Sequence, residues 1–201
     1  MSYIGSKPAN KPVVASDLDP TVITGQTALA TSPADTDEFL ISDAGVLKRL
    51  DASLIGGTNT PAFEAYTASQ TSLSDNTETK VLFGTEVFDT NSCYSSSRFT
   101  PTVAGKYYCY AQVRGGGGAN NSMLTMYVVF KKNGSYYHGS TVPTYQIGTS
   151  YKFNNMSLEI SSTIDFNGSS DYLEVYVLVD STTTPRYEAQ ASLFGAYKII
   201  E

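Results

Sequence analysis

Tryptophan is absent from this chain, histidine occurs once, and cysteine occurs twice. A single imidazole, His138, cannot build a histidine-based metal site, and it gives no Ser-His-Asp arrangement to nominate. Cys93 and Cys109 do not have the spacing of a zinc motif. They are read either as two buried thiols or as one disulfide, and the sequence leaves both readings open.

Charged side chains are also scarce, at 16% of the residues, and they sum to a formal net charge of −6. No cluster of Lys and Arg is available to neutralise phosphates, which excludes a nucleic-acid binder. Tyrosine, by contrast, occurs 15 times. A weakly charged surface rich in Tyr, Ser, Thr and Asn is suited to subunit contacts or to adaptable recognition.

Segments for targeting and for catalysis are missing as well. The first residues lack a basic start followed by an apolar run, so we expect synthesis in a cytoplasm without a signal peptide. The glycine run 114–119 lacks the Lys-Ser/Thr ending of a phosphate loop. The carboxylates of Asp165, Asp171, Glu174 and Asp180 fall at strand ends or beside turns, where acids commonly serve turn geometry. An enzyme is therefore the least favoured reading.

The composition changes at the Gly-Gly-Thr-Asn-Thr-Pro stretch 56–61, which is typical of a linker. We therefore divide the chain into an arm, 1–57, a linker, 58–61, and a head, 62–201. The arm opens with three prolines and no helical period in residues 1–20, which predicts extended chain. Its residues 38–50 predict a small β-hairpin, which is marginal alone and needs a partner.

The sequence of the head predicts an all-β fold, an antiparallel sandwich of ten strands. Turn signals lie at Asn133-Gly134, Asn167-Gly168 and Ala104-Gly105. The last strand is apolar on both faces, which suggests burial in the core and also against a neighbouring subunit. The expected strands are 62–69, 80–84, 86–89, 97–100, 106–114, 123–132, 135–142, 154–166, 171–180 and 190–200.

The run Phe99 to Val113, taken with Phe63-Glu64-Ala65 and Phe194-Gly195-Ala196-Tyr197, resembles the globular head of complement component 1q, a relative of the tumour necrosis factor family. The resemblance covers 61–201 and implies a jelly roll that acts as a trimeric binding module. It departs at Cys109, where the family prefers a large aromatic residue. It implies no cofactor, and it leaves a calcium ion at the trimer apex open. The candidate trimer-interface residues are Tyr108, Tyr110, Phe194 and Tyr197.

In that family the two ends of the domain lie together at its base. Counting strands back from the last one then places the loops 115–122, 143–153 and 181–187 at the far end. Long loops at a free tip, with tight turns at the base, are expected of a recognition head. The candidate ligand-binding residues are Arg114, Tyr145, Tyr151, Arg186 and Tyr187.

The arm resembles the amino-terminal region of tailed-phage fibre and receptor-binding proteins, through Ile4-Gly5-Ser6-Lys7-Pro8, 16–24, 37–43 and 46–50. The resemblance implies a virion protein, a tail fibre whose homotrimeric head contacts host surface glycan or lipopolysaccharide. One alternative is a capsid decoration or head-fibre protein. A second is a secreted complement-like ligand, against which the absent signal peptide counts. The candidate attachment residues to other virion proteins are Ile4, Pro8, Phe39, Ile41 and Leu47.

Overall fold

The structure is a computed structural model that describes residues 36–55, 59–143 and 153–199, together with Gly25, Thr27, Pro33 and Ala34. The side chains of Leu47, Val142 and Pro143 lie outside this description. The chain divides into two compact units, Met1–Gly56 and Gly57–Glu201. Each unit is described by itself, and the second is called the head below.

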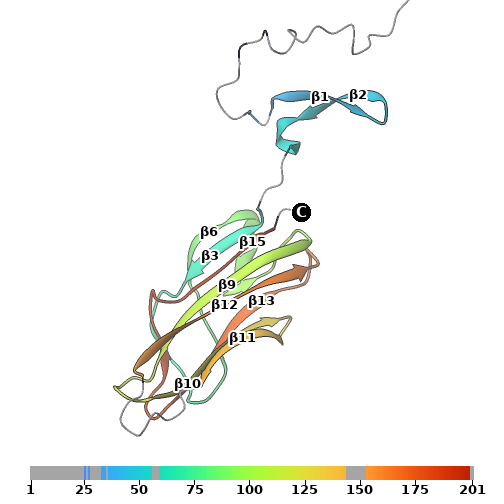
Figure 1. Ribbon diagram of the computed structural model, residues 1–201. Helices are drawn as coiled ribbons and strands as arrows, with labels where there is room; N and C mark the ends of the chain where they lie inside the picture. The colour runs from blue at the N-terminus through green and yellow to red at the C-terminus, as the bar shows by residue number, and fades with distance from the viewer. Residues whose placement is uncertain are drawn as a thin grey trace, which may run out of the picture. The chain divides into compact units, whose positions relative to one another are not determined.

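Strands dominate the head, where two antiparallel sheets pack face to face (Figure 1). The six-stranded sheet contains, in spatial order, β11 (Ser135–Pro143), β10 (Met123–Lys132), β13 (Leu173–Ser181), β8 (Arg98–Phe99) and β7 (Tyr94–Ser95), with β5 (Thr79–Lys80) also paired to β13. The seven-stranded sheet contains β4 (Thr71–Ser72), β14 (Arg186–Tyr187), β9 (Gly105–Gly116), β15 (Leu193–Lys198), β3 (Ala62–Tyr66) and β6 (Thr85–Asp89), with β12 (Asn155–Phe166) on the other edge of β9. This arrangement confirms the predicted all-β antiparallel sandwich.

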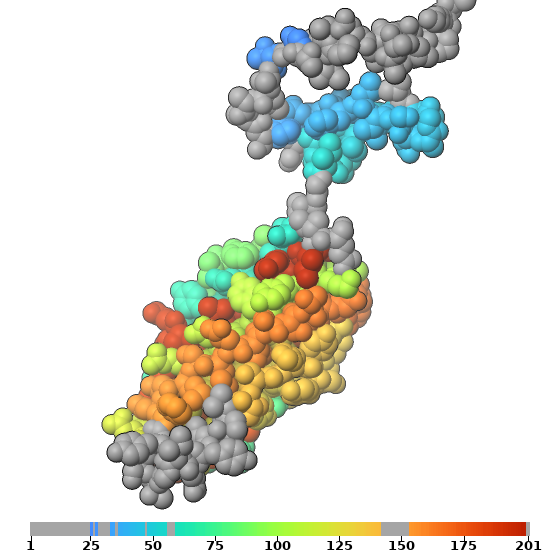
Figure 2. All heavy atoms as spheres, viewed as in Figure 1, coloured from blue at the N-terminus to red at the C-terminus, as the bar shows by residue number. Residues whose placement is uncertain are grey.

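β12 and β11 belong to different sheets but run side by side, in orange and gold in Figure 2, and close one side of the sandwich. At the opposite margin of the seven-stranded sheet, β6 pairs only with β3 in the described head. The β3–β6 register shifts between Glu64 and Ala65, which leaves Val87 as an extra residue in a β-bulge. Val87 and Phe88 are 57% and 45% exposed there.

The core lies between the sheets and is filled by the inward residues of alternating strands. Phe63 is its aromatic centre, stacked on Tyr94 and Phe99 at ring distances of 4.5 and 4.8 Å. Phe194 meets Phe63 edge-on at 4.9 Å and is 0% exposed. The expectation that Phe194 lies at a subunit interface is therefore wrong, because its ring is buried within one molecule.

Each of the ten predicted strands has a counterpart, and the three further strands of the described part of the head, β4, β7 and β14, are two residues long. The main difference in length concerns 80–84, where β5 ends at Lys80. Beyond it the Val81 N–H still donates to the Val175 carbonyl at 2.9 Å, but the next two backbone donors use side-chain hydroxyls. The Leu82 N–H donates to the Tyr187 hydroxyl at 3.2 Å, and the Phe83 N–H donates to the Ser97 hydroxyl at 2.9 Å.

The two ends of the head are built differently. At one end, called the base, Asn133 donates to Asp171 at 2.8 Å and Lys132 donates to the Asp165 carbonyl at 2.7 Å. The first strand of the head also begins here and the last strand ends here, since the Lys198 N–H donates to the Pro61 carbonyl and the Ile199 N–H to the Lys106 carbonyl. The tight turns and both ends of the described head therefore share the base, as predicted.

The first unit contains the predicted hairpin, formed by β1 (Glu38–Asp43) and β2 (Val46–Asp51). Ala44 and Gly45, with φ of 49° and 81°, make the two-residue turn between the strands. A short 3-10 helix, η2 (Ala52–Leu54), follows β2. The extended segment predicted for 1–20 lies outside the described residues. Among the described residues, no helix is long and apolar enough to cross a membrane.

Candidate functional site

The outward side of the seven-stranded sheet carries a group of tyrosines, here called the tyrosine face. The ladders pair Tyr108 with Tyr197 and Tyr110 with Gly195, which brings these side chains together on one surface. The Tyr108 ring lies 6.1 Å from that of Tyr110 and 5.6 Å from that of Tyr197. Tyr197 is 39% exposed, and Tyr108 and Tyr110 are half-buried. The face consists of Glu64, Tyr66, Tyr108, Tyr110, Gln112, Leu193 and Tyr197.

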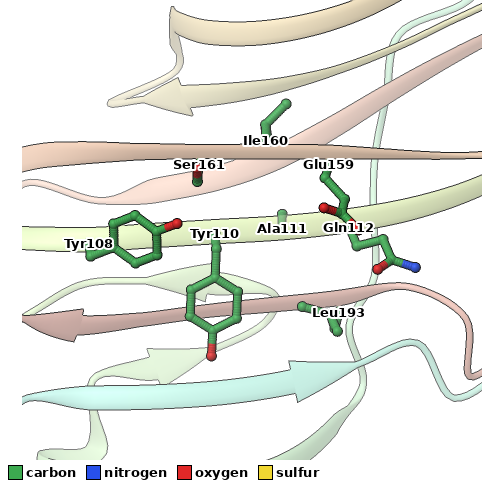
Figure 3. Close-up of a pocket in the computed structure, with 8 residues that line it drawn as sticks. All are labelled: Tyr108, Tyr110, Ala111, Gln112, Glu159, Ile160, Ser161 and Leu193. Carbon is green, nitrogen blue, oxygen red and sulfur yellow. The ribbon is translucent and has the colours of Figure 1, made fainter.

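A glycine determines how Tyr110 lies on this face. A Cβ at Gly195 would meet the Tyr110 ring end at 2.4 Å, so only glycine lets the ring cross β15. The hydroxyl then reaches β3 and donates to the Glu64 carboxylate at 2.7 Å. Figure 3 shows Tyr110 extending from β9 across the neighbouring strand. Burial raises the pKa of Tyr110, and Glu64 raises it further, so the hydroxyl remains a donor at neutral pH.

Two hollows open on the tyrosine face, and they share Gln112 and Leu193. The first has a volume of about 330 Å³ and lies over β9, β12 and β15, as Figure 3 shows. The second has a volume of about 420 Å³ and extends to Glu64 and Tyr66. Aromatic rings, amides and hydroxyls line them together with two carboxylates, Glu64 and Glu159. The face is thus an uneven amphipathic surface.

The end of the head opposite the base, called the tip, gathers the described parts of the three loops that were predicted to lie together. The Gly117 N–H donates to the Asn154 carbonyl at 2.9 Å, and the Thr182 N–H donates to the Ser122 carbonyl at 2.9 Å. Arg114 is exposed beside them. The Arg186 guanidinium pairs with Glu188 at 2.9 Å. Tyr145 and Tyr151 lie outside the described residues.

Tyr187 does not belong to the exposed part of the tip. Its side chain is 1% exposed, and its hydroxyl accepts the hydrogen bond from Leu82 described above. β14 places it opposite Gly115, and its ring belongs to the core at the tip end of the sandwich. The expectation that Tyr187 contacts a ligand is corrected, because a ring buried in this way has no surface to offer.

Of the attachment residues expected in the arm, the structure describes the side chains of two, Phe39 and Ile41. Phe39 is 42% exposed on β1, and Ile41 is half-buried on the same face. Ile4 and Pro8, and the side chain of Leu47, lie outside the described residues. Phe39 and Ile41 therefore share one accessible surface of the hairpin.

Both cysteines are free and buried. Burial raises the pKa of the Cys93 thiol, and Asp89, whose carboxylate accepts from the Cys93 sulfur at 3.0 Å, raises it further. Burial alone raises the pKa of Cys109. Neither thiol has the lowered pKa and exposure of a nucleophile. Within the described residues, no group of three or more His, Cys, Asp or Glu side chains is arranged to hold a metal ion.

A charge network on the six-stranded sheet was missed by the sequence reasoning. Glu174, which is 3% exposed, accepts from Lys80 at 2.8 Å and from Arg98 at 2.9 Å. Burial raises the pKa of Glu174, but the hydrogen bonds and charges of the two cations lower it by more, so it lies below its usual value. Strand alternation places Glu174 on the outward side. Nothing in the sequence indicates that two distant cations converge on it.

Comparisons with known proteins find the fold and little else. No protein-family model matches the sequence, and no curated protein matches it. The crystal structure of murine APRIL at pH 5.0 matches with a TM-score of 0.50 and 13% identity, covering 69% of this chain and 98% of that one. The head therefore has an antiparallel jelly-roll fold similar to that of APRIL.

Two further structures have TM-scores below 0.5. The globular domain of zebrafish complement 1qA matches at 0.47 with 12% identity, covering 70% of this chain and 98% of that one. Eiger TNF from S. frugiperda matches at 0.48 with 12% identity, covering 70% of this chain and 92% of that one. At such identities the likeness concerns the fold alone.

Proposed function

We propose that this protein is a self-assembling, non-enzymatic binding protein, a homotrimer whose heads contact one another through the tyrosine face. The observation that carries the proposal is the cluster of Tyr108, Tyr110 and Tyr197 on a face that also has two hollows. An aromatic surface of this kind on a soluble molecule is typical of a protein contact. Tyrosine is also favoured in such contacts because its ring is rigid and its hydroxyl can still donate.

Recognition is proposed at the tip. The base carries the tight turns and the two ends of the described head, which leaves the tip as the free end. Exposed Arg114 lies there with three loops, and arginine with tyrosine is the usual composition of a binding hot spot. The ligand class that we propose is a host surface polysaccharide, which aromatic rings and arginine can hold by stacking and hydrogen bonding.

The arm is proposed to attach the head to a tailed-phage particle, as part of a tail fibre or receptor-binding protein. The support for this step is the resemblance of the arm described above. The separate compact unit at Met1–Gly56 is compatible with an attachment module joined to a binding module. Residues ahead of the hairpin would make the contact with other virion proteins.

Two experiments test the proposal. An antibody to the head should label the tail in electron micrographs of purified particles, and labelling over the capsid would indicate a decoration protein.

The full-length chain should bind purified bacterial surface polysaccharide on an array. The triple variant Arg114→Ala, Tyr145→Ala and Tyr151→Ala should lose at least about tenfold in affinity. Lys198→Ala at the base is the control, and equal losses from both variants would contradict recognition at the tip.

A further inference from the structure

The hairpin of the first unit has one strongly apolar face. The register pairs Phe39 with Leu50, Ile41 with Lys48, and Asp43 with Val46, so these side chains share one side. Phe39 and Val46 are 42% and 58% exposed, although both are apolar. The apolar face, defined by Phe39, Ile41, Val46 and Leu50, is thus open at its two exposed members, while Ile41 and Leu50 are half-buried.

Four charged side chains of the hairpin form two ion pairs within it. Lys48 forms an ion pair with Asp43 at the turn end of the apolar face. Arg49 pairs with Glu38 at 2.9 Å on the opposite face. A second copy of the same face would therefore meet apolar side chains and a neutralised pair, with no net like-charge repulsion. Identical copies are suitable occupants for that reason.

The connection to the head favours the same occupant. Only residues 56–58 separate the described end of the hairpin unit from the described start of the head. Three residues reach at most roughly 10 Å. In a trimer of heads, three hairpins would be tethered at an effective concentration of about a millimolar or more, which promotes even weak contacts. A two-stranded hairpin that is marginal alone gains most from such contacts.

We propose that three copies of the hairpin pack their apolar faces around the three-fold axis and form a neck. This inference rests on the trimer proposed above and names a second surface that holds it together. It assigns Phe39 and Ile41 to contacts between copies of this chain, and it leaves the opposite face, with Leu40, pointing outward. The particle would then be contacted by that outward face and by residues that precede the hairpin.

Amide hydrogen exchange on the full-length protein tests the neck, with light scattering as a parallel measurement of mass. In the wild type, residues 38–51 should exchange at least about 100-fold more slowly than an unstructured chain. Phe39→Asp should abolish this protection and leave the trimeric mass and the exchange of the head unchanged. Leu40→Asp is the matched control, because Leu40 is the neighbouring residue, lies on the opposite face and is 77% exposed.

Each outcome decides the question. Equal effects of the two aspartates would contradict the neck, because both lower strand propensity and only one faces the proposed axis. A trimeric protein with an unprotected hairpin would contradict the neck alone, and protection gained only on the particle would identify a virion protein as the occupant. A monomeric mass for the wild type would instead contradict the proposed trimer.

Discussion

The outward sides of the two sheets of the head differ in whether their polar groups are already partnered. On the six-stranded sheet, Glu174 holds Lys80 and Arg98, and the Arg98 guanidinium lies 3.9 Å from the ring centre of Tyr172. On the same sheet Glu78 pairs with Lys131 and accepts from the Tyr127 hydroxyl at 2.5 Å. These charges and hydroxyls are satisfied within one molecule.

The seven-stranded sheet presents tyrosine rings, a hydrogen bond from Tyr110 to Glu64 and two hollows. Its rings are partly exposed and are fixed in place by neighbouring strands. Under the trimer proposed above, the seven-stranded sheet would meet a partner and the six-stranded sheet would remain in water. The two sides should therefore respond differently to similar substitutions.

The largest effect is expected from a charge placed on the tyrosine face. Tyr108→Asp should weaken self-association by about 30-fold or more, as loss of an interface hot spot of roughly 2 kcal/mol does. Light scattering across a dilution series measures the change. Tyr172→Asp, next to the six-stranded sheet, is the control. The Arg98 guanidinium can form an ion pair with the new carboxylate, so this variant should leave the mass unchanged. Dissociation by both variants would mean that assembly uses both sides.

The next effect concerns the charged side. Glu174→Gln leaves Lys80 and Arg98 facing a neutral amide, which should lower the free energy of unfolding by about 1–3 kcal/mol, since both cations keep access to water. Denaturant unfolding measures the loss. Glu159→Gln, an exposed carboxylate on the other sheet, should change stability by less than about 0.5 kcal/mol. A comparable loss from Glu159→Gln would show that the tyrosine face is stabilised by charge as well.

The same variant should change the response to acid. The pKa of Glu174 in the folded protein lies below its usual value of 4.5, so protonation favours the unfolded chain. Its contribution is complete above pH 4.5 and is lost as the pH falls through the lower, folded-state value. Unfolding measured from pH 6 down to about pH 3 should therefore decline less steeply in Glu174→Gln than in the wild type. Parallel curves would contradict the charge network.

The smallest effect is expected at Gly195. In Gly195→Ala the new methyl group displaces the Tyr110 ring, which costs the hydrogen bond to Glu64, worth about 1 kcal/mol. Self-association should weaken severalfold, and Tyr110 should titrate closer to an ordinary tyrosine in ultraviolet difference spectra. Gly84→Ala is the matched control, because its Cβ would meet only the Ala68 side chain at 4.0 Å. An unchanged titration in Gly195→Ala would show that the ring finds another route to Glu64.

Much of the fold could be predicted from alternation and turn chemistry. The long strands and the Asn133-Gly134 turn are strong local signals, and the structure confirms them. Alternation alone could not decide which side of β15 faces inward, because both sides are apolar. The decision is made by Ala65 and Phe63, which lie opposite Phe194 and Ala196 on the neighbouring strand and are 0% exposed. This long-range pairing with β3 is the reason that Phe194 faces the core.

The candidate site was predictable only in part for a related reason. Tyr108, Tyr110 and Tyr197 were selected because the strands that carry them are apolar on both faces, and the structure places those two strands side by side. Tyr187 was misplaced because β14 has two residues, which are too few to show a period. The link from Tyr110 to Glu64 joins residues 46 positions apart, and it depends on the missing side chain of Gly195.

The bulge at Val87 limits how these heads could join. An open strand at a sheet margin with apolar side chains is a template on which sheets of separate molecules can continue into fibrils. The extra residue in β6 interrupts the spacing of the backbone groups that such growth requires. Heads crowded together at high local density would therefore be kept from polymerising edge to edge. The heads can still form closed assemblies of defined size, because such assemblies use side chains on a sheet face.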